Sequence, residues 1–257
     1  PFTVRSTAID VDGQRIGVVA MDARLVGTAV EIARLDVDDQ PGVLRATGMV
    51  DYLTGAYDVE ITGQDLHWNN PVADAPVSAV TFGLSFTGAG TFDAPGGSGA
   101  LTATPLGGSI GDFVGVADVR WQFSGGRVNA TAFLPSLRAW AQATIDPQAP
   151  YAVRGVAAVN ALDVQPFALA AGALTQAVTG TVGLSAAFDG RLDDPRSFQA
   201  VVNLQNVDLS VGGLPVALQH PTRITARVDD FGVDDLALEV GSSTFTASGR
   251  FHDTANR

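Results

Sequence analysis

Hydrophobic and polar residues alternate with a period of two along much of this chain. Residues 57–62 place apolar side chains at odd positions and polar side chains at even positions, and residues 119–123 do the same. The alternation recurs in residues 207–211, 224–228 and 236–240. Because successive side chains of a strand point to opposite faces of its sheet, this pattern predicts strands with one apolar and one polar face.

Turn-forming residues separate these runs. The clusters are Asp12-Gly13, Gln40-Pro41-Gly42, Pro95-Gly96-Gly97 and Ser124-Gly125-Gly126. Turns at intervals of roughly ten residues are typical of antiparallel all-β chains. A helix is predicted only over residues 166–173, where Pro166 suits a first helical turn and Gly172 suits an end. The sequence therefore predicts an all-β fold with at most one or two short helices.

The chain also contains an internal repeat. Gly83-Leu84-Ser85 recurs as Gly183-Leu184-Ser185, and residues 90–95 recur at 190–195, both 100 positions later. We expect a partial repeat over residues 1–60, a repeat unit over 61–155 and a second, truncated unit over 156–257. Since one unit alone leaves sheet edges open, we expect the units to continue one another in a single β-structure.

Composition and charge exclude several classes of function. The formal charge is −12, and all 15 cationic side chains are arginines. Such an acidic chain repels phosphate backbones and offers no basic patch for anionic lipid headgroups, so we expect no nucleic-acid partner. The absence of cysteine excludes disulfides, cysteine–zinc sites and thiol catalysis. The first residue is Pro1, and we expect the sequence to be an excerpt from a longer protein.

The second repeat resembles TamB and the wider AsmA-like family. Residues 190–195 (GRLDDP) resemble that family's G-x-h-x-x-P turn, where h is hydrophobic, and residues 201–209 resemble the h-x-h-x-x-h-x-h strand that follows it. Residues 224–228 and 248–251 resemble the family's closing strands. The resemblance extends over nearly the whole chain, from about residue 20 to residue 257.

The resemblance implies an elongated, curled antiparallel sheet with a taco-like section and an apolar inner groove. It further implies a non-enzymatic periplasmic protein, anchored in the inner membrane outside this segment, that carries phospholipid towards the outer membrane and serves outer-membrane biogenesis. The implied ligands are phospholipid acyl chains, with no cofactor and no metal. For TamB, the resemblance adds an outer-membrane barrel protein as a partner.

Alternation assigns twelve aliphatic and aromatic residues to the inner face. Buried methylene groups gain about 0.8 kcal/mol each, so an acyl chain is a suitable occupant of such a face. The alternative is that these residues form the core of a closed extracellular β-sandwich that binds a protein or carbohydrate ligand. The residues are Val59, Ile61, Leu84, Phe86, Val119, Trp121, Phe123, Leu204, Leu209, Val211, Leu236 and Leu238.

One motif suggests catalysis. Gly107-Gly108-Ser109-Ile110-Gly111 matches the G-x-S-x-G nucleophile elbow, which requires a strand before the serine and a helix after it. A triad would draw its histidine from His220 or His252. Because residues 112–123 are expected to continue as a strand, we interpret the motif as a glycine-rich turn and expect no enzyme.

Metal binding finds little support in the sequence. The histidines, His67, His220 and His252, have no partner at metal-ligand spacing. Acidic clusters occur in residues 10–13, 36–39 and 229–235, but none has the glycine and distal glutamate of a calcium loop. Aspartates that accept hydrogen bonds from their own turns explain these clusters more simply.

Three further possibilities are also disfavoured. Trp68, Trp121 and Trp140 would suit a sugar-stacking platform, but they share no spacing, and Trp121 belongs to an apolar face. Residues 164–188 lack charge over a length that could cross a bilayer, yet their glycine, proline and alanine content favours a short helix followed by a strand. An outer-membrane barrel would carry aromatic girdles, whereas aromatic residues make up only 7% of this chain.

Overall fold

A computed structural model describes residues 1–6, 10–11, 14–15, 17–39, 42–70, 77–108, 111–170, 177–228 and 230–252. Within these residues nearly every element is a strand, and every strand pairing described is antiparallel. The all-β prediction is therefore confirmed. The chain divides into two compact units, the first comprising Pro1–Asp112 and Val116–Asn129 and the second comprising Phe113–Gly115 and Ala130–Arg257.

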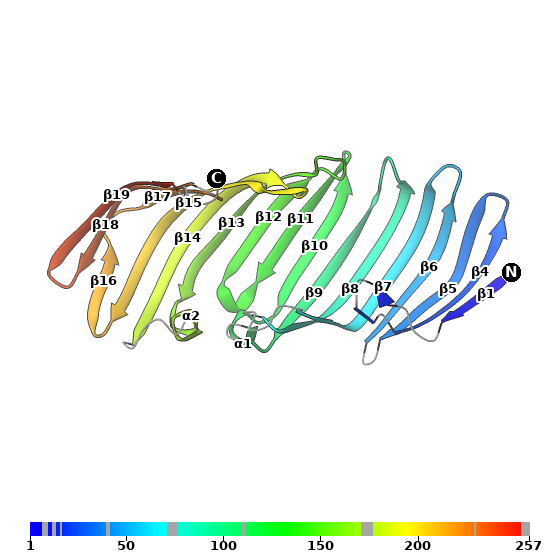
Figure 1. The fold of residues 1–257 in the computed structure, drawn as a ribbon, viewed down its shortest axis with the longest axis horizontal. Coiled ribbons are helices and arrows are strands. Elements are labelled where there is room, and N and C mark those ends of the chain that lie inside the picture. Colours follow the sequence, from blue (N-terminus) through cyan, green and yellow to red (C-terminus); the bar gives the residue numbers. More distant parts are fainter. Residues whose placement is uncertain are drawn as a thin grey trace. The chain divides into compact units, whose positions relative to one another are not determined.

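The first unit is a sheet of antiparallel strands in which most neighbours follow one another in sequence (Figure 1). Strand β1 pairs with β4 at one end of this order, and β10 pairs with β9 at the other end. The strands are β1 (Phe2–Ser6), β4 (Val18–Val26), β5 (Ala29–Asp39), β6 (Gly42–Asp51), β7 (Ala56–Asn69), β8 (Ala79–Thr91), β9 (Gly97–Leu106) and β10 (Ala117–Ser124). A separate hairpin joins β2 (Asp10–Val11) to β3 (Gln14–Arg15).

The second unit has an up-and-down order of its own. Its long strand β15 pairs with two shorter strands, β17 along its first half and β16 along its second, and β18 pairs with both of these in turn. The elements are β12 (Ala139–Ile145), β13 (Ala152–Asp163), β14 (Val178–Arg191), β15 (Asp194–Val211), β16 (Leu214–Leu218), β17 (Thr222–Arg227), β18 (Asp230–Val240) and β19 (Ser243–His252). Strand β11 (Arg127–Leu134) begins in the first unit and ends in the second.

Single extra residues interrupt the regular alternation of five strands. In β7, for example, Gly63 pairs with Leu84 and Leu66 pairs with Phe82, so three steps along β7 match two along β8. Such a β-bulge lets Gly63 and Leu66 share a face although an odd number of positions separates them. Comparable register shifts leave an extra residue in β5, β13, β15 and β18. Leu204 and Val207 therefore share a face although they are three positions apart, and their h-x-x-h spacing indicates the bulge in β15.

The repeated segments occupy matching strands. Gly83 lies in β8 and Gly183 in β14, and each strand follows a bulged partner, β7 or β13. After the repeated strands, Phe92 N–H donates to Gly55 O at 3.1 Å, and Leu192 N–H donates to Tyr151 O at 3.1 Å. The two turns thus share a main-chain hydrogen bond to the connection before the repeated strand. The repeat boundaries at 60/61 and 155/156 stay a prediction. The two compact units meet near residues 112–130, which is a different division of the chain.

Helical structure is confined to connections. Helix α2 (Gln165–Ala170) confirms the predicted helix at its start, while residues 171–176 lie outside the described residues. The expectation that residues 112–123 continue as a strand is wrong at its beginning, because α1 (Gly111–Val114) precedes β10. Gly115 follows with φ of 67°, a left-handed conformation that ends helices. One turn of 3₁₀ helix, η1 (Pro135–Leu137), joins β11 to β12.

No helix in the described part of the chain is both long enough and apolar enough to span a bilayer. The uncharged stretch 164–188 contains α2 and most of β14, as its composition predicts.

Candidate functional site: an apolar face on each unit

Strand register brings the predicted residues of the first unit onto one face. Ile61 pairs with Phe86, Phe86 with Gly99, and Gly99 with Trp121. A parallel row joins Leu84 to Leu101 and Leu101 to Val119. Because directly paired residues point to the same side of a sheet, Val59, Ile61, Leu84, Phe86, Val119, Trp121 and Phe123 share one surface, which we call the first apolar face.

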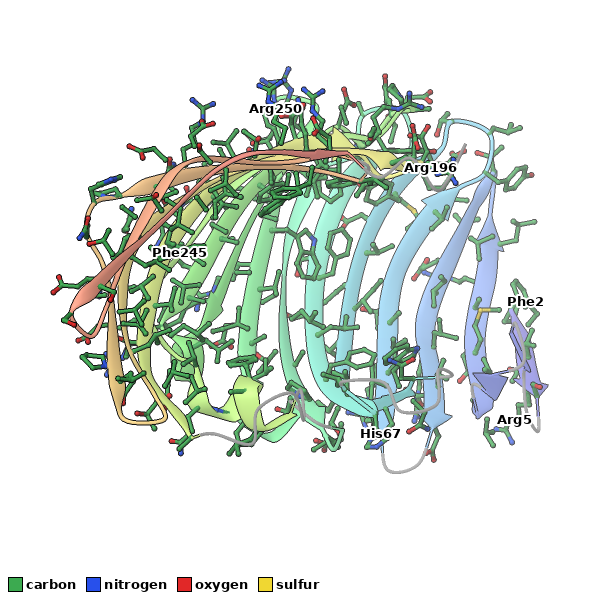
Figure 2. The ribbon with its side chains drawn as sticks, turned by 60° about the vertical axis from the view of Figure 1, so that its left-hand side comes forward. Phe2, Arg5, His67, Arg196, Phe245 and Arg250 are labelled. Atoms are coloured by element: carbon green, nitrogen blue, oxygen red, sulfur yellow. The ribbon has the colours of Figure 1, made fainter. Side chains whose placement is uncertain are left out.

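The second unit has an equivalent surface, which we call the second apolar face. Leu204 pairs with Leu184, Leu209 with Val216, and Leu238 with Leu218 and Phe245. Alternation and the bulges at 205–206 and 234–235 place all five predicted residues of this unit on that face: Leu204, Leu209, Val211, Leu236 and Leu238. Figure 2 draws the side chains on the ribbon and labels Phe245, the partner of Leu238 on the second apolar face.

Neither face carries a charge along its central strands. From β6 to β10, every position in register with Leu84 or Phe86 outside the bulge is apolar or glycine, except Tyr57. In β12–β19 of the second unit, the corresponding positions hold only two polar residues, Thr222 and Ser243. A surface of this kind offers contacts to hydrocarbon and no partner for an ionic group.

The opposite face of each sheet is polar. Asp58, Glu60, Arg120 and Gln122 are exposed in the first unit, as are Asp208, Arg227 and Glu239 in the second. Arg24 makes a two-point ion pair with Glu31 across β4 and β5, with N–O distances of 2.7 and 2.9 Å. Hydrogen bonding to Glu31 raises the pKa of Arg24 above its usual value. These exposed pairs keep one side of each sheet hydrated and contribute little to stability.

Aromatic rings on the first apolar face lie over glycines. A Cβ atom added to Gly99 would come within 2.2 Å of Trp121 Cζ2, and one added to Gly88 within 2.4 Å of Phe86 Cζ. The rings of Phe86 and Phe123 meet edge to face with centroids 6.4 Å apart. Packing along the sheet therefore covers part of each ring.

The exposure of the twelve predicted residues is uniform. All twelve are half-buried, and none is fully buried. The buried apolar side chains of the described residues are few and mostly small; they are Ala23, Ala29, Leu66, Val153, Ala158, Val207 and Ala237. In a closed sandwich, residues at the centre of an inner face are covered by the opposing sheet. Half-burial of Phe86 and Trp121 is what an uncovered face produces.

Sequence reasoning missed part of each face. Leu66, Trp68 and Phe82 belong to the first apolar face, and Val207 and Val233 belong to the second. Most of them follow a bulge, where the period of two changes phase. The h-x-x-h spacing in residues 204–207 and 233–236 is the signal that would have placed Val207 and Val233, whereas residues 63–66 begin with glycine and lack it.

The other candidates that lie among the described residues do not assemble into a site. Ser109 of the G-x-S-x-G motif and Asp12 of the first acidic cluster lie outside the described residues. His67 contacts Thr81 Oγ1 at 3.1 Å, and His220 lies 3.7 Å from Asp235 Oδ2. Among the described residues, no group of three potential ligands could hold a metal ion.

The tryptophans are divided between surfaces. Trp68 and Trp121 lie on the first apolar face, as the alternation predicts for Trp121. Trp140 pairs with Ala158 on the polar side of β12 and β13, opposite in facing to its neighbours Ala139 and Ala141. Because Trp140 does not share a face with Trp68 and Trp121, the three tryptophans do not form one sugar-stacking platform.

Comparison of the chain with models of protein families, with curated proteins and with solved structures finds no match in any of the three. A function for this chain therefore has to rest on its own residues and on the two apolar faces.

Proposed function

We propose that this chain is a non-enzymatic segment of a lipid-transport protein of the bacterial envelope, and that its two apolar faces hold phospholipid acyl chains. The protein is of the AsmA-like or TamB type, lies in the periplasm, and is anchored in the inner membrane through a part outside this segment. It serves traffic of phospholipid to the outer membrane, where an outer-membrane barrel protein is a candidate partner.

One observation carries the proposal: the twelve predicted residues of the two apolar faces are uncharged, and each is only half-buried. A folded chain in water ordinarily covers such a surface, because each exposed methylene group costs about 0.8 kcal/mol relative to its burial. Acyl chains supply this cover without requiring a polar partner from the protein. The charged residues of the opposite face keep the other side hydrated.

The alternative function is a closed β-sandwich module that binds a protein or carbohydrate through its surface. It requires a second layer over Phe86, Trp121 and their neighbours. Their half-burial favours the lipid-binding function over this alternative.

Lipid mass spectrometry of the protein purified from a didermal bacterium tests the proposal. The wild-type chain is expected to carry phospholipid, and the variant L84D/F86D is expected to lose most of it. The matched control S85D/T87D adds the same two charges to the exposed opposite face of β8 and is expected to retain lipid. A folded wild-type chain without bound lipid, or equal lipid on both variants, would contradict the proposal.

A further inference from the structure

Large apolar side chains are exposed at three consecutive hairpin turns along one edge of the first unit. The turns join β4 to β5, β6 to β7 and β8 to β9, and Figure 1 shows them on the same edge of the sheet. Turns ordinarily carry glycine, proline, asparagine, aspartate or serine. Here five residues, which we call the apolar rim, are 51–71% exposed: Leu25, Val26, Tyr52, Leu53 and Phe92.

Backbone hydrogen bonds join each of these turns to the next. Tyr52 N–H donates to Thr28 O at 3.1 Å. Phe92 N–H donates to Gly55 O, also at 3.1 Å. The Thr28 hydroxyl in turn donates to Asp51 Oδ2 at 2.7 Å. The exposed side chains therefore lie on an edge that is already ordered, so binding through them has few further groups to order.

The apolar rim is continuous with the first apolar face. Leu25 pairs with Val30, Val30 with Val50, and Val50 with Tyr57, so these four residues form one row across the sheet. The ring of Tyr57 stacks on that of Phe92, with centroids 6.0 Å apart. An apolar surface thus leads from the exposed turns to the face on which acyl chains are proposed to bind.

The second unit repeats the exposed turn residue. Phe92 is the third residue of the repeated segment 90–95, and Leu192 is the third residue of its counterpart 190–195. Leu192 is 53% exposed, and its N–H donates to the carbonyl oxygen of Tyr151, which is itself 43% exposed. An exposed apolar residue at the same position of both turns indicates a requirement that the repeats share.

The charges near the apolar rim favour an uncharged membrane surface as its partner. Residues 25–30, 51–57 and 90–96 contain two aspartates, Asp51 and Asp93, and no arginine, lysine or histidine. These carboxylates repel anionic lipids and repel the same edge of a second copy, whereas zwitterionic headgroups carry no net charge. Tyrosine, phenylalanine and leucine are also side chains that suit the boundary between headgroups and acyl chains.

We propose that the apolar rim inserts into the surface of a bilayer of zwitterionic phospholipid, and that acyl chains reach the first apolar face across it. The passage of acyl chains rests on the proposed function, whereas the insertion does not. Neighbouring turns lie two strand spacings apart, about 10 Å, so the three turns enter the bilayer as a row. The residues from Leu25 to Tyr57 then give an acyl chain continuous apolar contact.

Flotation with phosphatidylcholine vesicles tests the insertion. We expect the wild-type chain to float and Y52S/L53S to bind at least about tenfold more weakly, because two exposed apolar side chains are lost. The control L169S/L214S removes apolar side chains of similar exposure, 70% and 57%, from the second unit and is expected to bind as the wild type does. Replacing about a third of the lipid by phosphatidylglycerol is expected to weaken binding at low salt.

A fluorophore on a single engineered cysteine locates the contact independently, since the chain has no cysteine of its own. L53C places the label on the apolar rim, and T87C places it on the exposed polar face of β8. With an environment-sensitive label, we expect phosphatidylcholine vesicles to shift the emission of L53C to the blue and to leave that of T87C unchanged.

Uptake of fluorescent phospholipid from the vesicles separates this inference from the proposed function. L84D/F86D is expected to float like the wild type without taking up lipid, whereas Y52S/L53S is expected to lose both properties. Uptake by Y52S/L53S at the wild-type rate would overturn the role of the apolar rim and leave the proposed function standing. Flotation that depends on the rim, without any uptake by the wild type, would contradict the proposed function and leave the insertion standing.

Four other results would overturn the insertion. They are a folded wild-type chain that does not float, equal flotation of Y52S/L53S and L169S/L214S, tighter binding to vesicles that contain phosphatidylglycerol, and equal blue shifts of L53C and T87C.

Discussion

The indole of Trp121 lies directly over Gly99 on the neighbouring strand, so close that a Cβ atom at residue 99 would approach Cζ2 to 2.2 Å. The two residues are register partners in the pairing of β10 with β9. Glycine thus provides the space in which the ring packs along the sheet. This contact buries part of a large aromatic side chain without a second layer.

Replacing Gly99 by alanine is expected to displace the Trp121 ring and to lower the free energy of unfolding by about 1–3 kcal/mol. The control is G83A in β8, where an added Cβ meets only Gly63 O at an ordinary 3.4 Å. Urea unfolding followed by tryptophan fluorescence measures both variants. Equal stability of G99A and G83A would show that the ring does not depend on the glycine.

Aspartate substitutions at sites of different burial test whether the faces are uncovered. L84D places a charge at a half-buried position, where water reaches the carboxylate, so we expect a loss of about 1–2 kcal/mol. V207D places it at a side chain only 8% exposed, and we expect about 3–5 kcal/mol. Chemical denaturation compares the two. A loss at Leu84 as large as that at Val207 would indicate a covered face.

Deletions of single residues test the role of the bulges. Removing Asp65 from the bulge of β7 leaves Gly63 and Leu66 on the same face, because the strand then alternates regularly, and we expect a cost below about 2 kcal/mol. Asp65 also has φ of 51°, which is unfavourable for a non-glycine residue.

Removing Ser85 from β8, which pairs with β9 without a register shift, reverses the facing of one half of that strand. We expect this deletion to prevent cooperative unfolding or to cost more than about 4 kcal/mol. Thermal unfolding by circular dichroism distinguishes the two deletions. Equal tolerance of both would contradict the assigned register.

Asp51, in the turn after β6, makes the free energy of unfolding depend on pH in the acid range. Hydrogen bonds donated by Thr54 N–H, by the Thr28 hydroxyl and by Leu53 N–H lower the pKa of Asp51, with the first making the largest contribution. A lowered pKa means that the carboxylate stabilises the fold above the unfolded-state pKa. This stability is lost as the pH falls through the folded-state pKa.

We therefore expect the stability difference between wild type and D51A to shrink as the pH falls from above the unfolded-state pKa through the lowered folded-state pKa, because Asp51 is then protonated in both states of the wild type. Unfolding curves at a series of pH values measure it. A difference that stays constant or grows over this range would contradict the role of the charged carboxylate.

The alternation of residues 57–62 is enough to assign Val59 and Ile61 to one face and Asp58 and Glu60 to the other. It fails at Leu66, because a bulge adds one residue and no hydrophobic pattern states which residue is extra. The hydrophobic pattern does not predict the helix at residues 111–114 either, because Phe113 and Val114 fit an apolar run. The helix ends at Gly115, whose left-handed conformation the pattern does not reveal.

The contact of Trp121 with Gly99 cannot be predicted from the sequence. The residues are 22 positions apart, and only the register of β9 with β10 brings them together. The same holds for Phe86 and Phe123, which meet across an intervening strand. Sequence therefore predicts which residues share a face, whereas the distances between them depend on strand order and register.

The most direct test uses two tryptophans on opposite faces. Trp121 lies on the first apolar face and Trp140 on a polar face, so single-tryptophan variants W68F/W140F and W68F/W121F report on each. Both are mixed with phospholipid brominated along its acyl chains. The account predicts strong fluorescence quenching of Trp121 and little of Trp140. Equal quenching of the two, or none of Trp121 in a folded protein, would contradict the binding of acyl chains to the apolar face.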